Sequence, residues 1–118
     1  MHNKTILITG VAGLLGSRLA EYIIEKKPGN TVIGIDDLSG GYESNIPSEV
    51  KFYKANCENL EEIKPIMKNV DVVIHAAAYP HEGLSSFSPF LICKSNFIGS
   101  VSVFTASVQN NVKRIVFC

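Results

Sequence analysis

The sequence of 118 residues has few cysteines and no excess of charge of either sign. Its three cysteines, Cys57, Cys93 and Cys118, are odd in number and form no C-x-x-C pair. We therefore expect free thiols in a reducing compartment, with neither a disulfide framework nor a metal site. Eleven basic and eleven acidic residues give a formal net charge of zero. That balance argues against electrostatic binding to nucleic acid or to an anionic membrane.

Long apolar runs are also missing from the sequence. The apolar stretch from Thr5 to Leu15 is interrupted by Gly10 and Gly13, and charge returns at Arg18. No run of 18 apolar residues occurs, so we expect no signal peptide and no membrane span, and we expect a soluble cytoplasmic protein. Hydrophobic residues still make up 46% of the chain, which favours one folded domain over disorder.

Short β-branched segments alternate with segments of helical periodicity. We expect strands at Thr5–Thr9, Thr31–Asp36, Val50–Lys54, Asp71–His75 and Arg114–Cys118. We expect helices at about Gly13–Lys27, Asn59–Lys68 and Pro89–Asn110, the second with Asn59 as a candidate N-cap and Pro65 as a weak point. This alternation predicts an α/β fold with a parallel sheet, five strands in the order 3-2-1-4-5 and helices on both faces.

Two of the expected helices carry apolar stripes at helical spacing. In the first helix the stripe consists of Leu15, Leu19 and Ile23. In the last helix it consists of Phe97, Val101, Phe104 and Val108. We expect the second stripe to face the core.

Three glycines, Gly10, Gly13 and Gly16, lie between the first strand and the first helix. In this context a glycine loop is typical of a Rossmann-type dinucleotide site. Gly10 would let the chain turn, Gly13 would let the backbone approach a diphosphate, and Gly16 would let the helix pack close to the sheet. The helix N-terminus contributes only about 0.3–1 kcal/mol toward an exposed anion, so further contacts must add to it.

Two carboxylates, Asp36 and Asp37, end the second strand. Asp36 lies 20 residues after Gly16, where a carboxylate can accept the hydroxyls of an adenosine ribose. A 2′-phosphate about 4 Å from one carboxylate would be disfavoured by roughly 4 kcal/mol at an effective dielectric constant of about 20. We therefore expect NAD as the cofactor in preference to NADP, with Arg18 as the one nearby cation that opposes this preference.

The run TGVAGLLG, with its spacing G-x-x-G-x-x-G, resembles the opening of the extended short-chain dehydrogenase/reductase family, the NAD-dependent epimerases and dehydratases of nucleotide sugars. IDDLSGG, from residue 35 to 41, resembles the ribose-binding segment of UDP-glucose 4-epimerases, and VIHAAA, from 73 to 78, resembles the family's fourth-strand motif. The family's S-x-x-x-P-x(6)-N-x-x-G-T pattern is matched in spacing by Ser85, Pro89, Asn96, Gly99 and Ser100. The resemblance covers essentially the whole chain.

This resemblance implies a set of cofactor-binding residues. The glycine loop would line the diphosphate, the segments after the second and third strands would meet the adenosine, and the alanines after the fourth strand would pass near the nicotinamide ribose. Asn96 would lie in the helix behind the active site. The residues so implied are Gly10, Ala12, Gly13, Leu14, Leu15, Gly16, Asp36, Asp37, Ser39, Gly40, Asn56, Cys57, Ala76, Ala77, Ala78 and Asn96.

Three positions depart from the family's pattern. Asp37 stands where related epimerases often carry Asn, and Asn56 stands where an Asp is usual. Pro80 stands where UDP-galactose epimerases carry a Lys that reaches the cofactor. The last departure weakens the resemblance to that particular enzyme more than the resemblance to the family.

The family's hydride chemistry uses a Tyr-x-x-x-Lys pair and a Ser or Thr after the fifth strand. The only Tyr-x-x-x-Lys in this sequence is Tyr22–Lys26, on the expected first helix, so we expect no catalytic residue within residues 1–118. We expect His75, at the end of a buried strand, to be a structural histidine. For His81 and Glu82, in the following loop, a substrate contact and a solvated loop are both open.

We therefore expect residues 1–118 to be an incomplete NAD-binding Rossmann domain without the catalytic and substrate-binding portions. The resemblance implies the NAD-binding part of an enzyme similar to UDP-glucose 4-epimerase, which oxidises and re-reduces a nucleotide sugar at C4 through bound NAD. Two alternatives stay open: a non-catalytic dinucleotide-sensing module, and the N-terminal part of a 4,6-dehydratase or reductase. A nucleotide sugar would bind only in the complete enzyme, for which a homodimer is also open.

Overall fold

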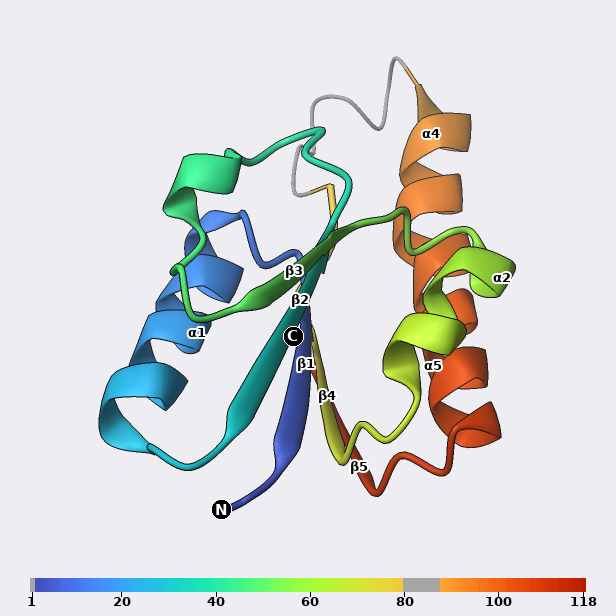
Figure 1. Ribbon diagram of the computed structural model, residues 1–118. Coiled ribbons are helices and arrows are strands. Elements are labelled where there is room, and N and C mark those ends of the chain that lie inside the picture. The colour runs from blue at the N-terminus through green and yellow to red at the C-terminus, as the bar shows by residue number, and fades with distance from the viewer. Residues whose placement is uncertain (1, 80–87) are drawn as a thin grey trace.

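All five expected strands are present in the computed structural model, which describes residues 2–79 and 88–118 (Figure 1). They form one parallel sheet in the order β3-β2-β1-β4-β5, so the predicted fold class and strand order are confirmed. The register pairs Leu7 of β1 with Ile33 of β2 and with Val73 of β4. The strands are β1 (Thr5–Thr9), β2 (Thr31–Asp36), β3 (Lys51–Lys54), β4 (Val72–His75) and β5 (Arg114–Phe117).

Helices cover both faces of this sheet. Figure 1 shows α1 (Leu14–Lys26) on one side, with the short turn η1 (Glu43–Asn45) nearby. On the other side lie α2 (Leu60–Ile63), α4 (Pro89–Cys93) and α5 (Gly99–Gln109). The turn η2 (Pro65–Met67) follows α2, and the π-helical segment η3 (Lys94–Ile98) joins α4 to α5.

The core has two layers because alternate residues of a strand point to opposite faces of the sheet. Ile6 and Ile8 belong to the cluster under α1, and Leu7 belongs to the cluster under α2 and α5. All three side chains are fully buried. A central strand buried on both faces explains why TILIT is apolar or β-branched throughout.

The expected helix over Asn59–Lys68 is divided in two. Asn59 is its N-cap, and the Asn59 side chain accepts a hydrogen bond from the N–H of Glu62. Helix α2 ends at Ile63, and the 3₁₀ turn η2 begins at Pro65. Pro65 has no N–H with which to continue the α-helical ladder, so the helix changes geometry there.

The apolar stripe predicted for the last helix is not its buried face; of its four residues, only Phe104 is half-buried, against His75 and Phe117. Phe97, Val101 and Val108 are 63%, 44% and 74% exposed, while Val103 and Ala106 are fully buried. Small residues face the rest of the domain because they allow α5 to lie close to it, and the π-helical turn of η3 rotates the preceding residues. The buried residues of α5 are Gly99, Ser102, Val103, Ala106 and Ser107.

The combined helix Pro89–Gln109 is long and apolar enough, by length and composition, to cross a membrane. Our expectation of no span relied on uninterrupted apolar runs, whereas this helix reaches its mean hydropathy of 1.3 with polar residues interspersed. Val103 and Ala106 of this helix pack in the same core cluster as Leu7 and Val73 of the sheet. A mostly buried core helix meets the same length and composition criterion, but only 28% of the most apolar window of this helix is buried.

Candidate functional site

A cavity of about 660 Å³ opens at the carboxyl ends of β1, β2 and β4. In a parallel sheet this is the edge at which ligands bind, where the strand order reverses. The predicted residues in its lining are Gly10, Gly13, Leu14, Leu15, Gly16, Asp36, Asp37, Ser39, Gly40, Asn56, Cys57, Ala76, Ala77 and Ala78. Sequence reasoning did not place Ile35, Gly41, Ala55, Glu58, Tyr79 or Ser95 there, although all lie within or next to predicted segments. Of the predicted set, Ala12 and Asn96 lie outside the lining.

Gly10 makes the turn that leads the chain out of β1. Its φ of +73° lies in the left-handed region that favours glycine, and a Cβ would lie 2.9 Å from the backbone of Ala77. The N–H of Gly10 donates to the carbonyl of Ile35 at 2.8 Å. The loop is therefore enclosed between the ends of β2 and β4, where no larger side chain fits.

Gly13 and Gly16 let α1 begin directly over this turn. The N–H of Gly13 donates to the carbonyl of Gly10 at 3.1 Å. A Cβ on Gly16 would lie 2.1 Å from the same carbonyl oxygen, which leaves space only for hydrogen. The third glycine therefore has the close-packing role that its spacing predicts.

The first turn of α1 leaves its backbone donors free. Within the described part of the chain, no hydrogen bond uses the N–H groups of Leu14, Leu15 or Gly16, and the regular ladder begins with Ser17 donating to Gly13. No side chain in the part of the chain that the structure describes caps this end of the helix. Three adjacent amides at a helix N-terminus form a site suited to an anion.

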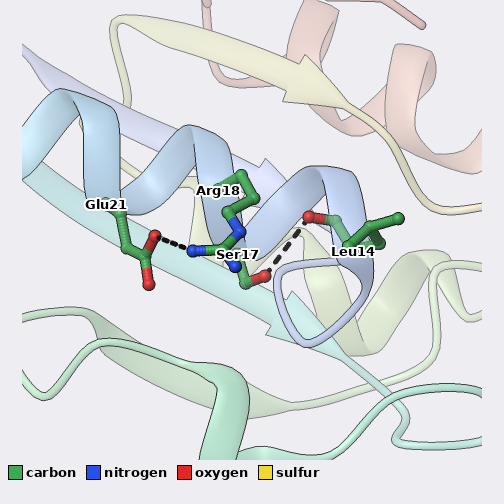
Figure 2. Close-up of polar contacts among 4 residues, drawn as sticks. All are labelled: Leu14, Ser17, Arg18 and Glu21. Atoms are coloured by element: carbon green, nitrogen blue, oxygen red, sulfur yellow. Dashed lines mark hydrogen bonds and ion pairs between the residues drawn. The ribbon is translucent and has the colours of Figure 1, made fainter.

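Polar side chains of α1 have their partners within the same helix beside this turn. Figure 2 shows the hydroxyl of Ser17 donating to the carbonyl of Leu14 at 3.3 Å, and Nη1 of Arg18 lying 2.8 Å from Oε2 of Glu21. Arg18 lines the main cavity, and it also lines a second, smaller cavity together with Glu21. The guanidinium that lines the cavity is therefore paired with a carboxylate.

Asp36 ties the glycine loop to the loop after β2. Its Oδ2 accepts from the N–H of Ala12 at 2.9 Å, and its Oδ1 accepts from the N–H of Leu38 at 2.8 Å. A carboxylate has about four acceptor positions, so two remain for other donors. The Ala12 amide, which we expected to line the diphosphate, is thus bonded to Asp36.

The loop after β2 packs tightly against the glycine loop. Asn45 Nδ2 donates to the carbonyl of Ala12 at 3.1 Å, and a Cβ on Gly41 would lie 2.5 Å from that oxygen. Asp37 Oδ1 accepts from both the N–H and the hydroxyl of Ser39. Asn45 is a contributor that sequence reasoning missed, because no spacing rule connects it to Ala12, 33 residues earlier.

Carboxylates surround the end of the cavity next to β3. Asp36, Asp37 and Glu58 all line it, together with the half-buried Cys57. Burial, and after it the charges of Asp37, Asp36 and Glu58, together raise the pKa of the Cys57 thiol to about 12. This thiol is therefore protonated and unreactive at neutral pH.

The opposite end of the cavity is formed by Ala76–Tyr79, the segment that follows β4. Asn96 holds this segment from behind, because its Oδ1 accepts from the N–H of Tyr79 at 2.7 Å and its Nδ2 donates to the carbonyl of Tyr79 at 3.2 Å. Next to it His75 is 2% exposed, between the hydroxyls of Thr9 and Ser100. Burial lowers the pKa of His75.

The remaining candidates lie elsewhere. Tyr22 and Lys26 are exposed on α1 and do not line the cavity. Pro80, His81, Glu82 and Ser85 lie outside the described residues. In the described part of the chain no group of three or more potential metal ligands occurs.

Comparisons with known proteins agree with this geometry. A family model described as the NAD dependent epimerase/dehydratase family matches residues 6–118. The chain is 30% identical to the UDP-N-acetylglucosamine 4,6-dehydratase (inverting) of Campylobacter jejuni, over 98% of this chain and 36% of that protein. More broadly, it spans between 28% and 40% of the length of the curated relatives.

Solved structures of this fold superpose closely on the chain. The UDP-glucose 4-epimerase of Thermotoga maritima, solved with UDP-glucose, is 32% identical with a TM-score of 0.90, over 96% of this chain and 37% of that one. The UDP-glucose 4-epimerase of Thermus thermophilus, solved with NAD, is 28% identical with a TM-score of 0.89, over 96% of this chain and 36% of that one.

Proposed function

The chain belongs to the NAD-dependent epimerase/dehydratase family, and from this we propose that residues 1–118 are the NAD-binding portion of a nucleotide-sugar epimerase of the UDP-glucose 4-epimerase type. One observation carries the proposal: a single cavity brings the three unbonded amides of Leu14, Leu15 and Gly16 together with the carboxylate of Asp36. A dinucleotide requires both groups, anion donors for its diphosphate and a carboxylate for its ribose.

The cavity fits this cofactor in size and chemistry. Its volume of about 660 Å³ lies within the range of roughly 300–1,000 Å³ found for small-molecule sites. In the proposed arrangement the first turn of α1 binds the diphosphate, the two remaining acceptor positions of Asp36 take ribose hydroxyls, and Asn56 and Cys57 flank the adenine. The small side chains of Ala76, Ala77 and Ala78 leave room for the nicotinamide ribose. Bound NAD would supply a hydride acceptor and donor for chemistry at the sugar.

The charges around the cavity favour NAD over NADP. A 2′-phosphate beside the ribose would meet the carboxylates of Asp36 and Asp37, each repelling it by roughly 4 kcal/mol at about 4 Å and an effective dielectric constant of about 20. Arg18 could offset this repulsion only in part, because its guanidinium is already paired with Glu21 (Figure 2).

Calorimetry with NAD and with NADP tests the proposal. We expect NAD to bind more tightly, and we expect Asp37→Asn to narrow the difference by up to about a thousandfold, as expected for removal of roughly 4 kcal/mol of repulsion. Glu25→Gln is the matched control, because it removes one carboxylate from an exposed position of α1 outside the cavity. Failure to bind either cofactor would refute the proposed function, whereas equal binding of both would refute only the role of the carboxylates.

A 4,6-dehydratase is the second candidate. The Campylobacter jejuni dehydratase is 30% identical to this chain and the Thermotoga maritima epimerase is 32% identical, so identity does not separate the two reactions. The residues that choose between these reactions are not among the cavity-lining residues identified above. Under either reaction, the nucleotide sugar would bind to the complete enzyme.

We also propose that residues 1–118 do not turn over a nucleotide sugar by themselves. The one Tyr-x-x-x-Lys pair, Tyr22–Lys26, is exposed on α1, away from the cavity. We expect that NMR spectra of the protein incubated with UDP-glucose and NAD will show no UDP-galactose. Sustained turnover would show that the cavity contains its own acid–base group.

The three free cysteines and the zero net charge fit a soluble cytoplasmic protein without nucleic-acid or membrane partners. A homodimer of the complete enzyme is part of the same proposal.

A further inference from the structure

A continuous chain of hydrogen bonds runs behind the cavity and connects β1, β4 and the helix Pro89–Gln109. The hydroxyl of Thr9 lies 2.7 Å from Nδ1 of His75. On the other side of the ring, Nε2 of His75 lies 2.9 Å from the hydroxyl of Ser100. The hydroxyl of Ser100 lies 2.6 Å from the backbone carbonyl of Asn96.

The partners at each end fix the direction of these bonds. Ser100 has one hydroxyl proton, which it donates to the carbonyl of Asn96, so its oxygen must accept from Nε2–H of His75. At the other end the hydroxyl oxygen of Thr9 already accepts from the amides of Ala76 and Ala77, each at 3.2 Å. Thr9 must therefore donate its own proton to Nδ1. Both ends independently assign the neutral Nε2–H tautomer to His75.

The surroundings of the ring also favour its neutral form. From α5 the ring of Phe104 lies 6.0 Å away, and from β5 the ring of Phe117 lies 5.6 Å away, both between ring centroids. The groups that face the imidazole from β1 and α5 are the hydroxyls of Thr9 and Ser100, and no charged side chain of the described residues contributes to its pKa. In an imidazolium, Nδ1 would also carry a proton, and the hydroxyl of Thr9 would have to accept from a third donor. The positive charge would also lie among apolar groups.

Both ends of this chain hold one short segment of the cavity wall. Thr9 accepts from the amides of Ala76 and Ala77, where the segment begins. The backbone carbonyl of Asn96 accepts a hydrogen bond from the hydroxyl of Ser100. The side chain of Asn96 binds both the N–H and the carbonyl of Tyr79, where the segment ends. A single histidine ring connects these two attachment points, because it accepts on one side and donates on the other.

We propose that His75, in its neutral Nε2–H form, is a positioning residue that fixes the cavity wall Ala76–Tyr79 by holding the hydroxyls of Thr9 and Ser100 in defined directions. It does not touch the ligand itself. This inference rests on the proposed function only in its last step, that the fixed wall receives the nicotinamide ribose of NAD.

The first experiment measures the tautomer in the ligand-free protein. Long-range ¹H–¹⁵N correlation spectra at pH 7.5 distinguish the two neutral forms of a histidine ring. We expect His75 to be in a single Nε2–H form and the exposed His2 to show averaging between forms, as a control. A protonated Nδ1, or averaging at His75, would overturn the assignment and the proposal.

The second experiment uses a matched pair of substitutions at the fully buried Thr9. Thr9→Val preserves shape and removes the hydroxyl, whereas Thr9→Ser retains the hydroxyl. We expect Thr9→Val to speed amide exchange at Ala77 and to weaken NAD binding, each about tenfold, as for one lost hydrogen bond. The effect at Ala76 should be smaller, because its amide also donates to the backbone carbonyl of Thr9 at 3.3 Å. Thr9→Ser should keep the amide exchange rates and the affinity for NAD close to those of wild type, which a role in packing alone would not explain.

The outcomes separate the two proposals. If the tautomer and exchange results appear but wild-type protein binds no NAD, the proposed function fails and the positioning role stands. If NAD binds and Thr9→Val changes neither exchange nor affinity, the positioning role fails and the proposed function stands. If Thr9→Val does not fold, the tautomer of His75 in the wild-type protein still decides the positioning role.

Discussion

At the scale of single residues, Asp36 has a structural role in addition to its proposed contact with ribose. Its carboxylate accepts from the N–H groups of Ala12 and Leu38, and Ala12 is fully buried, so water cannot replace the lost acceptor there. We expect Asp36→Ala to lower the free energy of unfolding by about 1–3 kcal/mol, the usual cost of an unsatisfied buried group. Urea denaturation monitored by circular dichroism measures this loss.

The neighbouring carboxylate provides the control for this prediction. Among the described residues, Asp37 accepts only from the exposed backbone and hydroxyl of Ser39, where water can take its place. Asp37→Ala should change the free energy of unfolding by less than about 0.5 kcal/mol. Equal losses at Asp36 and Asp37 would mean that the bond to Ala12 contributes little to stability.

The thiol of Cys57 should be protected from alkylation. Burial, together with the carboxylates around it, raises the pKa of this thiol to about 12 from an ordinary value of 9.0, which leaves about a thousandfold less thiolate at pH 8. Cys93 and Cys118 are exposed. Mass spectrometry after a short treatment with iodoacetamide should find both of them modified and Cys57 unmodified. Alkylation of Cys57 at the rate of Cys93 would contradict the raised pKa, and unfolding in urea should equalise the three rates.

At the scale of secondary-structure elements, the helix that ends at Gln109 shows where sequence periodicity fails. Two stripes of helical spacing coexist on it, one of large apolar residues that includes Val101 and Val108, and one of small residues around Val103 and Ala106. Hydrophobicity alone selects the first stripe. Close packing selects the second, because a helix approaches the rest of the domain through its small residues, and sequence alone does not state that distance.

Paired substitutions on this helix test which face is buried. Val103→Ala removes two carbons from a fully buried site, and we expect it to lower the free energy of unfolding by about 1.5–3 kcal/mol. Val101→Ala is the same chemical change at a site that is 44% exposed, and we expect a change below about 1 kcal/mol. Chemical denaturation of both variants gives the comparison, and a larger loss for Val101→Ala would assign the buried face to the stripe that periodicity predicts.

At the scale of the whole molecule, the sheet and the location of the cavity could be predicted from sequence because both follow from local patterns. Thr5–Thr9 is apolar or β-branched as a doubly buried strand requires, and the carboxyl ends of parallel strands place Gly10 near Asp36. The hydrogen bonds inside the site could not be predicted in this way. The bond between Thr9 and His75 joins residues 66 positions apart, and its direction depends on Ser100 and Asn96 as well.

Acid should destabilise the whole domain partly through His75. Burial lowers the pKa of His75 in the folded protein below its ordinary value of 6.5. As the pH falls below about 6.5, the unfolded chain therefore binds a proton that the folded chain excludes, and stability declines by at most about 1.4 kcal/mol per pH unit until the lower, folded-state pKa is reached. Above about pH 7 this contribution is fully present. Urea denaturation at pH 7.5, 6.5 and 5.5 should show that the free energy of unfolding declines more steeply for wild type than for His75→Gln, which cannot titrate there.

His2→Gln, at an exposed position, is the control and should follow wild type, and the carboxylates shared by all three proteins cancel in the comparison. Parallel declines for wild type and His75→Gln would show that the folded protein accepts the proton as readily as the unfolded chain does.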